Sequence, residues 1–374
     1  MKKQQKRNIK SSKQVILRQK RKKRRRIRAA ILIVELILVA VLGTAAYSMF
    51  KLDKMNMTVL DNIENNGVKR EGYTNVALFG TDNRLGETTG VRSDCIIVAS
   101  IDNNTKEVKL VSVYRDTLLM QADGYFNKAN SAYANGGPEE AINMLNRNLD
   151  LDIEDYATVN FMSLAEVVDL LGGIDVELTV AEIENMNKYI PETGKIAGKE
   201  AHLIDATEGT YHLDGVQAVT YCRIRSTEGG DFKRAERQRV MIGLIVDKAK
   251  EANLSTLNQI IDAVLPEVST SFTASELMKL AAGILEYSIV GTESFPFDYE
   301  ASGSVPGYTG WYNVPLGISD NTVKLHQFLF PNEEYTPTEA LQGISDELIE
   351  VTGFYPVEEI EEVSEEYDSE GTYE

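Results

Sequence analysis

One apolar segment constrains this chain more than any other feature. It reads AAILIVELILVAVLGTAAYSMF, from Ala29 to Phe50, and Glu35 is its only charged residue. About 20 apolar residues allow a helix to span a bilayer, so we expect one transmembrane helix at 29–50. A cleaved signal peptide is the alternative, although GTAAYS is a weak cleavage site. We expect Glu35 to reach the inner headgroups, and a partner helix is the alternative.

Charge is strongly segregated on the two sides of this segment. Residues 1–28 carry 15 Lys and Arg and no acid, whereas residues 51–374 contain 24 basic and 56 acidic side chains. The positive-inside rule therefore places the amino terminus in the cytoplasm and the rest outside the cell membrane. A basic arm beside a membrane helix favours anionic lipid headgroups over nucleic acid. The acidic body, with a formal charge of −32, also argues against nucleic acid as a partner.

Composition divides the outer part into three regions. Residues 51–72 are polar with scattered apolar positions and predict an extracellular stalk. We expect one folded domain at 73–333. Residues 334–374 turn acidic, and nine of the last seventeen residues are Asp or Glu, which predicts a disordered tail.

Short apolar runs alternate with amphipathic segments inside the domain. Strands are predicted at 75–80, 92–102, 107–114, 174–178 and 216–225, and helices at 136–149, 160–173, 231–252 and 274–288. The first three strands are separated by polar turns and predict an antiparallel meander, since sequential strands usually neighbour one another. The fold class is therefore α/β, a single layered α-β-α domain with a mixed central sheet, preceded by one transmembrane helix.

The predicted meander brings charged residues to one edge of the sheet. Strand one ends at GTDNR, strand two begins at RSD, and strand three ends at YRDT. Because neighbouring strands are antiparallel, these three points meet at one end. The residues that converge there would be Asp82, Arg84, Arg92, Asp94, Arg115 and Asp116. Solvated loop charges are the simpler interpretation of any one of them. Together, carboxylates and guanidiniums suit an ion-pair network or a site for Mg²⁺ and phosphate.

A second concentration of charge is YCRIRSTEGGDFKRAERQR, Tyr221 to Arg239, with five arginines. If 216–225 is a strand, Arg223 and Arg225 point to one face. In the helix that follows, Arg234, Arg237 and Gln238 share a face. A surface helix with scattered charges is the alternative. Arginine provides the planar fork used in phosphate recognition, so the stretch favours an anion-binding site.

These segments resemble the successive motifs of the LytR–CpsA–Psr family. The motifs are FGTDNR, RSDCIIVASID, VSVYRDT, NKANSAYANGG, VDLLGGIDV and YCRIRSTEGGDFKRAERQR, in the family's order over roughly residues 73–250, and WYNVPLGISDNTVKLHQFLF resembles the closing segment. The family's enzymes move anionic glycopolymers, such as teichoic acid or capsule, from an undecaprenyl-pyrophosphate carrier to peptidoglycan. The resemblance implies that activity here, with Mg²⁺ (or Mn²⁺), at the outer face of the membrane.

The resemblance also implies roles for individual residues. Asp82 and Asp94 match the metal-binding carboxylates. The residues that match the pyrophosphate site are Arg92, Arg115, Arg223, Arg225, Arg234 and Gln238. Asp231 is the candidate base, and Arg115 and Arg223 join it in catalysis. The roles of Arg84, Asp116 and Arg237 stay open between contact and scaffold, and we expect Arg239 to face solvent.

Two other functions remain open at this stage. One is a polyprenyl-pyrophosphate phosphatase, with water as the nucleophile. The other is a non-catalytic envelope regulator that binds lipid-linked polymer. Zinc hydrolysis and serine acyl transfer are disfavoured, because the three histidines are scattered and no HExxH, Walker, GxGxxG or GxSxG element is present.

Three further features of the sequence bear on the site. Tyr114 stands where many relatives have Pro. Cys95 and Cys222 could meet behind the site as a disulfide, but we favour two reduced, buried thiols. The helices around 139–171 could line a channel for a prenyl tail, although their apolar faces are better explained as ordinary core.

Overall fold

The computed structural model describes residues 56–81, 90–225, 230–264, 267–272, 276 and 287–356. The predicted transmembrane helix at 29–50, the basic arm and the helix predicted at 274–288 lie outside these ranges, apart from Glu276, Tyr287 and Ser288. Among the helices within them, none is both long enough and apolar enough to cross a bilayer.

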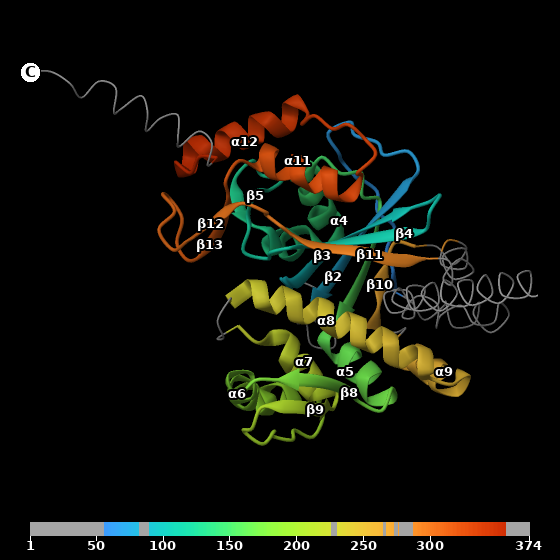
Figure 1. Ribbon diagram of the computed structural model, residues 1–374. Helices are drawn as coiled ribbons and strands as arrows, with labels where there is room; N and C mark the ends of the chain where they lie inside the picture. Colours follow the sequence, from blue (N-terminus) through green and yellow to red (C-terminus); the bar gives the residue numbers. More distant parts are fainter. Residues whose placement is uncertain are drawn as a thin grey trace, which may run out of the picture.

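A seven-stranded mixed sheet separates two layers of helices (Figure 1). The strand order is β1-β10-β7-β2-β3-β4-β11, and the meander predicted from sequence forms its centre, with β2–β3 and β3–β4 both antiparallel. Strand β7 is parallel to β2, and β11 is parallel to β4. In sheet order the strands are β1 (Asn56–Met57), β10 (Ser269–Thr270), β7 (Asp155–Asn160), β2 (Tyr73–Thr81), β3 (Ser93–Asp102), β4 (Glu107–Val113) and β11 (Ser288–Phe295).

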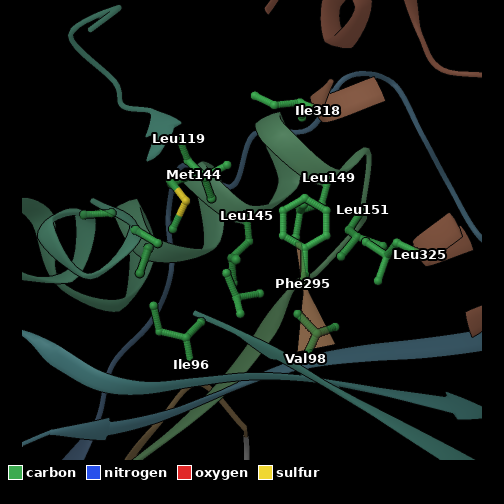
Figure 2. Packing of buried hydrophobic residues seen from close by; sticks show 14 of the residues in the cluster. Ile96, Val98, Leu119, Met144, Leu145, Leu149, Leu151, Phe295, Ile318 and Leu325 are labelled. Carbon is green, nitrogen blue, oxygen red and sulfur yellow. The ribbon is translucent and has the colours of Figure 1, made fainter. Parts of the chain in front are cut away.

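One helical layer is formed by α4 (Ala129–Leu149), α11 (Ile318–Leu329) and α12 (Glu339–Thr352). Ile96 and Val98 of β3 point to this layer, because alternate residues of a strand face opposite sides of a sheet. Figure 2 shows them below Met144 and Leu145 of α4. The side chains of Met144 and Leu145 are completely buried. The apolar faces at 139–149 are therefore packed core, which was the simpler of the two interpretations.

The opposite layer covers the other face of the same strands. Ile97, Ala99 and Ile101 of β3 point into it. Its elements are α5 (Phe161–Leu170), β8 (Ile174–Leu178), α6 (Val180–Ala197), β9 (Gly209–Leu213), α7 (Gly215–Arg223), α8 (Gly230–Glu251) and α9 (Leu254–Val264). The predicted strand at 174–178 is present as β8, but it pairs with β9 outside the main sheet.

Two small hairpins lie near the edge of the sheet where β4 ends. They are β5 (Leu118–Met120) with β6 (Phe126–Lys128), and β12 (Tyr299–Ser302) with β13 (Tyr312–Pro315). Thr117 forms a parallel bridge with Asn313, so the second hairpin is attached directly beyond the end of β4.

The predicted strand at 216–225 is wrong, because Gly215–Arg223 is helix α7. Asp214 caps this helix: its carboxylate accepts from the backbone N–H of Gln217, and the Gln217 side chain accepts from the backbone N–H of Asp214. This reciprocal capping box satisfies two donors at the helix start. The capping stabilises a helix in spite of the β-branched residues that suggested a strand.

The boundaries predicted for the domain are also too narrow. Residues 58–72 pack on the domain rather than forming a separate stalk: the backbone N–H of Glu64 donates to Asn143 Oδ1 at 2.8 Å, and Leu60 and Ile63 pack against the core. Part of the predicted disordered tail is helix α12, whose Leu341 and Leu348 are completely buried. The domain therefore includes residues 56–72 and 334–356, and 357–374 lies outside the described residues.

Candidate functional site

Asp94 occupies an irregular position at the start of β3. Cys95 lies opposite Gly80 and Ser93 lies opposite Thr81, so Asp94 is the extra residue of a β-bulge. A bulge changes the direction of a side chain at a strand end. Gly80 permits the close approach, because a Cβ there would be 2.8 Å from the Cβ of Cys95. The bulge thus places a carboxylate at the end of the sheet where β2, β4, β7 and β11 all terminate.

Arg115 follows β4 and binds the Asp94 carboxylate. Its Nη1 donates to Asp94 Oδ1 at 2.6 Å, and its Nε donates to Asp116 Oδ2 at 3.1 Å. The side chains of Arg115 and Asp94 are only 14% and 17% exposed. The backbone carbonyl of Arg115 also accepts from the N–H of Asn130, at 3.0 Å. The meander therefore brings RSD and YRDT together, as the sequence predicts.

Lys128 extends the same charged cluster, and sequence reasoning missed it. Its Nζ donates to Asp116 Oδ1 at 2.7 Å and lies 5.0 Å from the centre of the Tyr312 ring. The signal was available, since Lys128 is part of the quoted motif NKANSAYANGG. Positive and negative side chains thus alternate in one continuous chain: Lys128, Asp116, Arg115 and Asp94.

Arg225 and Arg234 approach Asp94 from the opposite helical layer. Arg225 lies two residues beyond α7, and its Nη2 is 3.4 Å from Asp94 Oδ2. Arg234 belongs to the first turns of α8 and is 4% exposed. Both positive charges act on the Asp94 carboxyl. The cluster therefore has contributions from the sheet and from the helical layer that includes α8.

Asp94 is ionised in spite of its burial. Burial alone would raise the pKa of this carboxyl, but Arg115, Arg234 and Arg225 more than offset that effect, and the pKa lies below its ordinary value. One carboxylate shared by several guanidiniums leaves a net positive site. Such an arrangement is suited to phosphate oxygens, which arginine binds through two parallel hydrogen bonds.

Three other predicted residues have different surroundings. Arg223 donates from Nη1 to Thr193 Oγ1 at 3.1 Å and lies 3.9 Å from Glu192, both on α6. Gln238 is buried on α8, with Nε2 3.5 Å from the carbonyl of Cys222. Arg92 is exposed just before β3. Their roles in binding remain predictions.

Two further arginines of α8 have partners in neighbouring elements. Arg237 is 5% exposed, and its Nε donates to Glu182 Oε1 of α6 at 2.9 Å. Arg239 was expected to face solvent, which is wrong. Its Nη1 lies 2.9 Å from both Ser112 Oγ of β4 and Ser294 Oγ of β11. The long side chain of Arg239 instead links α8 to two parallel strands of the sheet.

The predicted metal ligands can be assessed only in part. Asp82 and Arg84 lie outside the described residues, and so does the side chain of Asp231, whose backbone belongs to the first turn of α8. Within the described part of the chain, no three His, Cys, Asp or Glu side chains gather as a metal site. Mg²⁺ is commonly held by one or two carboxylates together with substrate phosphates. Ionised Asp94 beside several arginines fits that kind of site.

The two cysteines are free thiols, which agrees with the favoured prediction. Cys95 packs against the core from β3, and Cys222 is buried in α7. Burial raises the pKa of Cys95 to about 12. Cys222 thus lies on a helix and not on the strand predicted at 216–225.

The order of these motifs along the chain agrees with a comparison of the sequence with models of protein families. The model of the LytR_cpsA_psr family matches residues 41–315 of the 374. The chain belongs to the LytR–CpsA–Psr family. The match includes every predicted site residue and ends at the last residue of β13.

Curated relatives within the LytR–CpsA–Psr family are named as transferases. A polyisoprenyl-teichoic acid–peptidoglycan teichoic acid transferase, TagU of Enterococcus faecalis, is 31% identical over 258 residues, which cover 67% of this chain and 80% of TagU. TagV of Bacillus subtilis has the same activity in its name and is 28% identical over 264 residues. That match covers 67% of this chain and 65% of TagV, slightly under two thirds of the relative.

Solved structures of the family share the fold. The crystal structure of Bacillus subtilis TagV matches with a TM-score of 0.51 and 25% identity, covering 72% of this chain and 100% of the TagV chain. Protein gbs0355 from Streptococcus agalactiae matches with a TM-score of 0.59 and 21% identity, covering 81% of this chain and 96% of the other.

Proposed function

We propose that this protein transfers an anionic glycopolymer from a polyprenyl-pyrophosphate carrier to a hydroxyl of peptidoglycan. The observation that carries the proposal is the cluster in which Arg115, Arg225 and Arg234 surround one ionised carboxylate, Asp94. The names of TagU and TagV support a teichoic acid as the polymer and peptidoglycan as the acceptor.

The reaction would be a phosphoryl transfer with a single exchange of bonds. The acceptor hydroxyl oxygen attacks the phosphorus that carries the glycopolymer, and a new P–O bond forms. The P–O bond to the carrier breaks, and polyprenyl monophosphate leaves with the bond's electrons. Arg115, Arg225 and Arg234 neutralise the phosphate oxygens and stabilise the leaving group. We assign removal of the hydroxyl proton to Asp231, as the family resemblance implies.

A divalent cation fits this scheme. Asp94 would hold Mg²⁺ or Mn²⁺ together with phosphate oxygens, and Asp82 is the second ligand implied by the family resemblance. When bound, the cation would add positive charge at the pyrophosphate. Lys128 would keep Asp116 and Arg115 in place and add a further positive charge near the phosphates.

We also propose a place for the reaction. The apolar segment at 29–50 and the basic arm before it favour a single-pass membrane protein whose amino terminus is cytoplasmic and whose catalytic domain is outside. A carrier with a long prenyl tail is held in the membrane, so an anchored enzyme would meet it there.

The test uses the full-length protein in detergent, a lipid-linked teichoic acid and peptidoglycan. Arg115→Lys keeps one charge but removes the fork that binds two oxygens, so we expect turnover to fall by roughly 10²-fold or more. Arg147→Lys is the matched control: its side chain is 19% exposed and also ion-paired, but its partners are Glu64 and Glu140. Equal turnover by both variants would contradict the assigned site.

The products separate this function from its alternatives. A transferase joins polymer to peptidoglycan and releases polyprenyl monophosphate. A phosphatase would release the polymer with a terminal phosphate that is not joined to peptidoglycan, whether or not peptidoglycan is present. A regulator would bind the lipid-linked polymer and form neither product.

A further inference from the structure

The β12–β13 hairpin is attached directly to the charged cluster. The backbone N–H of Asn313 donates to the carbonyl of Asp116 at 3.0 Å, and Tyr312 packs under the Lys128 ammonium. Because Asp116 pairs with Arg115, the hairpin is one residue removed from the proposed phosphate site.

Trp311, just before β13, presents a supported aromatic ring to solvent. It is 66% exposed and is the single tryptophan of the chain. The ring lies over Gly303: a Cβ at that glycine would be 3.7 Å from two indole carbons. One face of the indole is thus held against the hairpin backbone, while the exposure of the residue leaves the other face open.

A second aromatic group connects the hairpin to the catalytic segment. The Phe232 ring of α8 lies 5.4 Å from that of Tyr299 on β12 and 4.8 Å from that of Tyr114, which precedes Arg115. Phe232 is 50% exposed. From Tyr299 to Ser302, which pairs with Tyr312, the strand extends roughly 10 Å. The two exposed rings, Phe232 and Trp311, therefore lie near opposite ends of this paired segment.

The hairpin lacks the charges that an anionic partner would need. Residues 298–315 contain two acids, Asp298 and Glu300, and no Lys, Arg or His. This composition repels a polyanion and an anionic lipid surface. Uncharged sugar rings instead present C–H groups, which are attracted to the negative faces of aromatic rings.

We propose that the hairpin, with Trp311 at one end and Phe232 beside Tyr299 at the other, is the docking surface for the acceptor glycan strand of peptidoglycan. The inference rests on the proposed transferase function and deepens it. Sugar rings would stack on the open face of Trp311, and the strand would continue past Phe232 to present a hydroxyl at the Arg115 cluster. The anionic donor would occupy the arginine side, so the two polymers approach from different directions.

Because Trp311 is the only tryptophan, its fluorescence reports binding without turnover. The full-length protein is titrated with soluble, uncrosslinked glycan strands of N-acetylglucosamine and N-acetylmuramic acid whose lactyl carboxyl groups are blocked as amides, so that the strand is uncharged. We expect a saturable shift of the emission to shorter wavelength as sugar covers the indole. Soluble teichoic acid and vesicles containing anionic lipid are titrated in parallel, and we expect no shift with either. A shift with teichoic acid or vesicles in place of the glycan, or no shift at all, overturns the proposal.

Kinetics provide a second and independent measurement. For Trp311→Ala we expect the KM for the glycan acceptor to rise about three- to tenfold, which corresponds to the loss of one stacked aromatic contact, with kcat and the KM for the donor unchanged. Trp311→Tyr should restore most of the loss. Tyr355→Ala removes another exposed aromatic side chain, 47% exposed, and should change nothing. A rise in the donor KM alone would overturn the assignment to the acceptor.

The two proposals can fail separately. If the protein has no transferase activity but Trp311 still responds to glycan strands, the docking surface stands and the proposed function fails. If transfer proceeds normally while Trp311→Ala leaves the acceptor KM unchanged, only the docking surface is wrong.

Discussion

Arg234, Arg237 and Arg239 lie within six residues of one helix but face three different environments. Arg234 acts on Asp94, Arg237 pairs with Glu182 on α6, and Arg239 reaches the serines of β4 and β11. Helical spacing predicted a shared face for Arg234 and Arg237, and it could not reveal which neighbour each guanidinium meets. Those partners come from strands and helices far along the chain.

Arg237 should matter for stability rather than for chemistry. Arg237→Ala leaves the largely buried Glu182 carboxylate without this partner, and we expect a loss of about 3–5 kcal/mol in the free energy of unfolding. Urea denaturation measures the loss. Lys233→Ala is the control, because its ion pair with Glu236 is half-exposed and should contribute about 1 kcal/mol or less. If Arg237→Ala stays folded but loses most of its turnover, Arg237 belongs to the site instead.

His326 should make stability depend on pH. Burial lowers its pKa to about 4, and Arg70 Nη2 lies 2.9 Å from Nδ1, where a proton would be repelled. Between pH 6.5 and 4 the unfolded chain binds a proton here that the folded chain does not. Stability should therefore fall as pH is lowered through this window, by about 1.4 kcal/mol per unit. Denaturation across the pH range should show a shallower slope for His326→Gln, and an unchanged slope would exclude this histidine as the source.

Among the elements, α7 shows why local pattern was insufficient. The segment VQAVTYCRIR is rich in β-branched and aromatic residues, which favour strands. The decisive signal was the preceding Asp214 and the Gln217 three residues later, which form the capping box. By contrast, 75–80, 92–102 and 107–114 were predicted well because apolar strands and polar turns agree with each other and with their neighbours.

Gly215 fixes the approach of α7 to α5. A Cβ there would meet the backbone of Ala165, with its carbonyl oxygen 2.1 Å away, so one helix must move. Gly215→Ala should lower stability by about 1–3 kcal/mol and displace Arg225 from Asp94, reducing turnover. Thermal unfolding and activity test both effects. Gly243→Ala in α8 meets no atom within 4 Å and should be neutral or stabilising. Equal stability and equal turnover of the two variants would show that close packing at Gly215 does not fix the position of α7.

At the scale of the whole molecule, the final described segment is part of the domain. Asp150 accepts from the Tyr335 hydroxyl at 2.7 Å and from the backbone N–H and hydroxyl of Thr338, each at 2.8 Å. The acidic composition of 334–374 hid this helix from prediction. The pattern Leu341, Ile344 and Leu348 after the cap at Thr338 is nevertheless that of an amphipathic helix.

Two truncated proteins should show that residues 334–356 contribute to stability and that residues 357–374 do not. Removing 334–374 deletes two buried leucines of α12 and the partners of Asp150, and we expect a loss of about 4 kcal/mol or more in stability. Removing only 357–374 keeps those contacts and should leave the denaturation midpoint unchanged. Calorimetry of both truncated proteins is the measurement. Equal stability of the two would show that α12 contributes little.

The sheet order has a consequence for how the protein must be made. Strands β2, β3, β4 and β7 are complete by residue 160, yet their neighbours β10 and β11 begin only at Ser269 and Ser288. At 5–20 residues per second, the ribosome needs roughly 6–25 seconds to produce residues 161–288. During that time the central strands exist with both outer edges unpaired, a state prone to mispairing and aggregation. The yield of active protein should therefore depend on what covers those edges before the last third of the chain arrives.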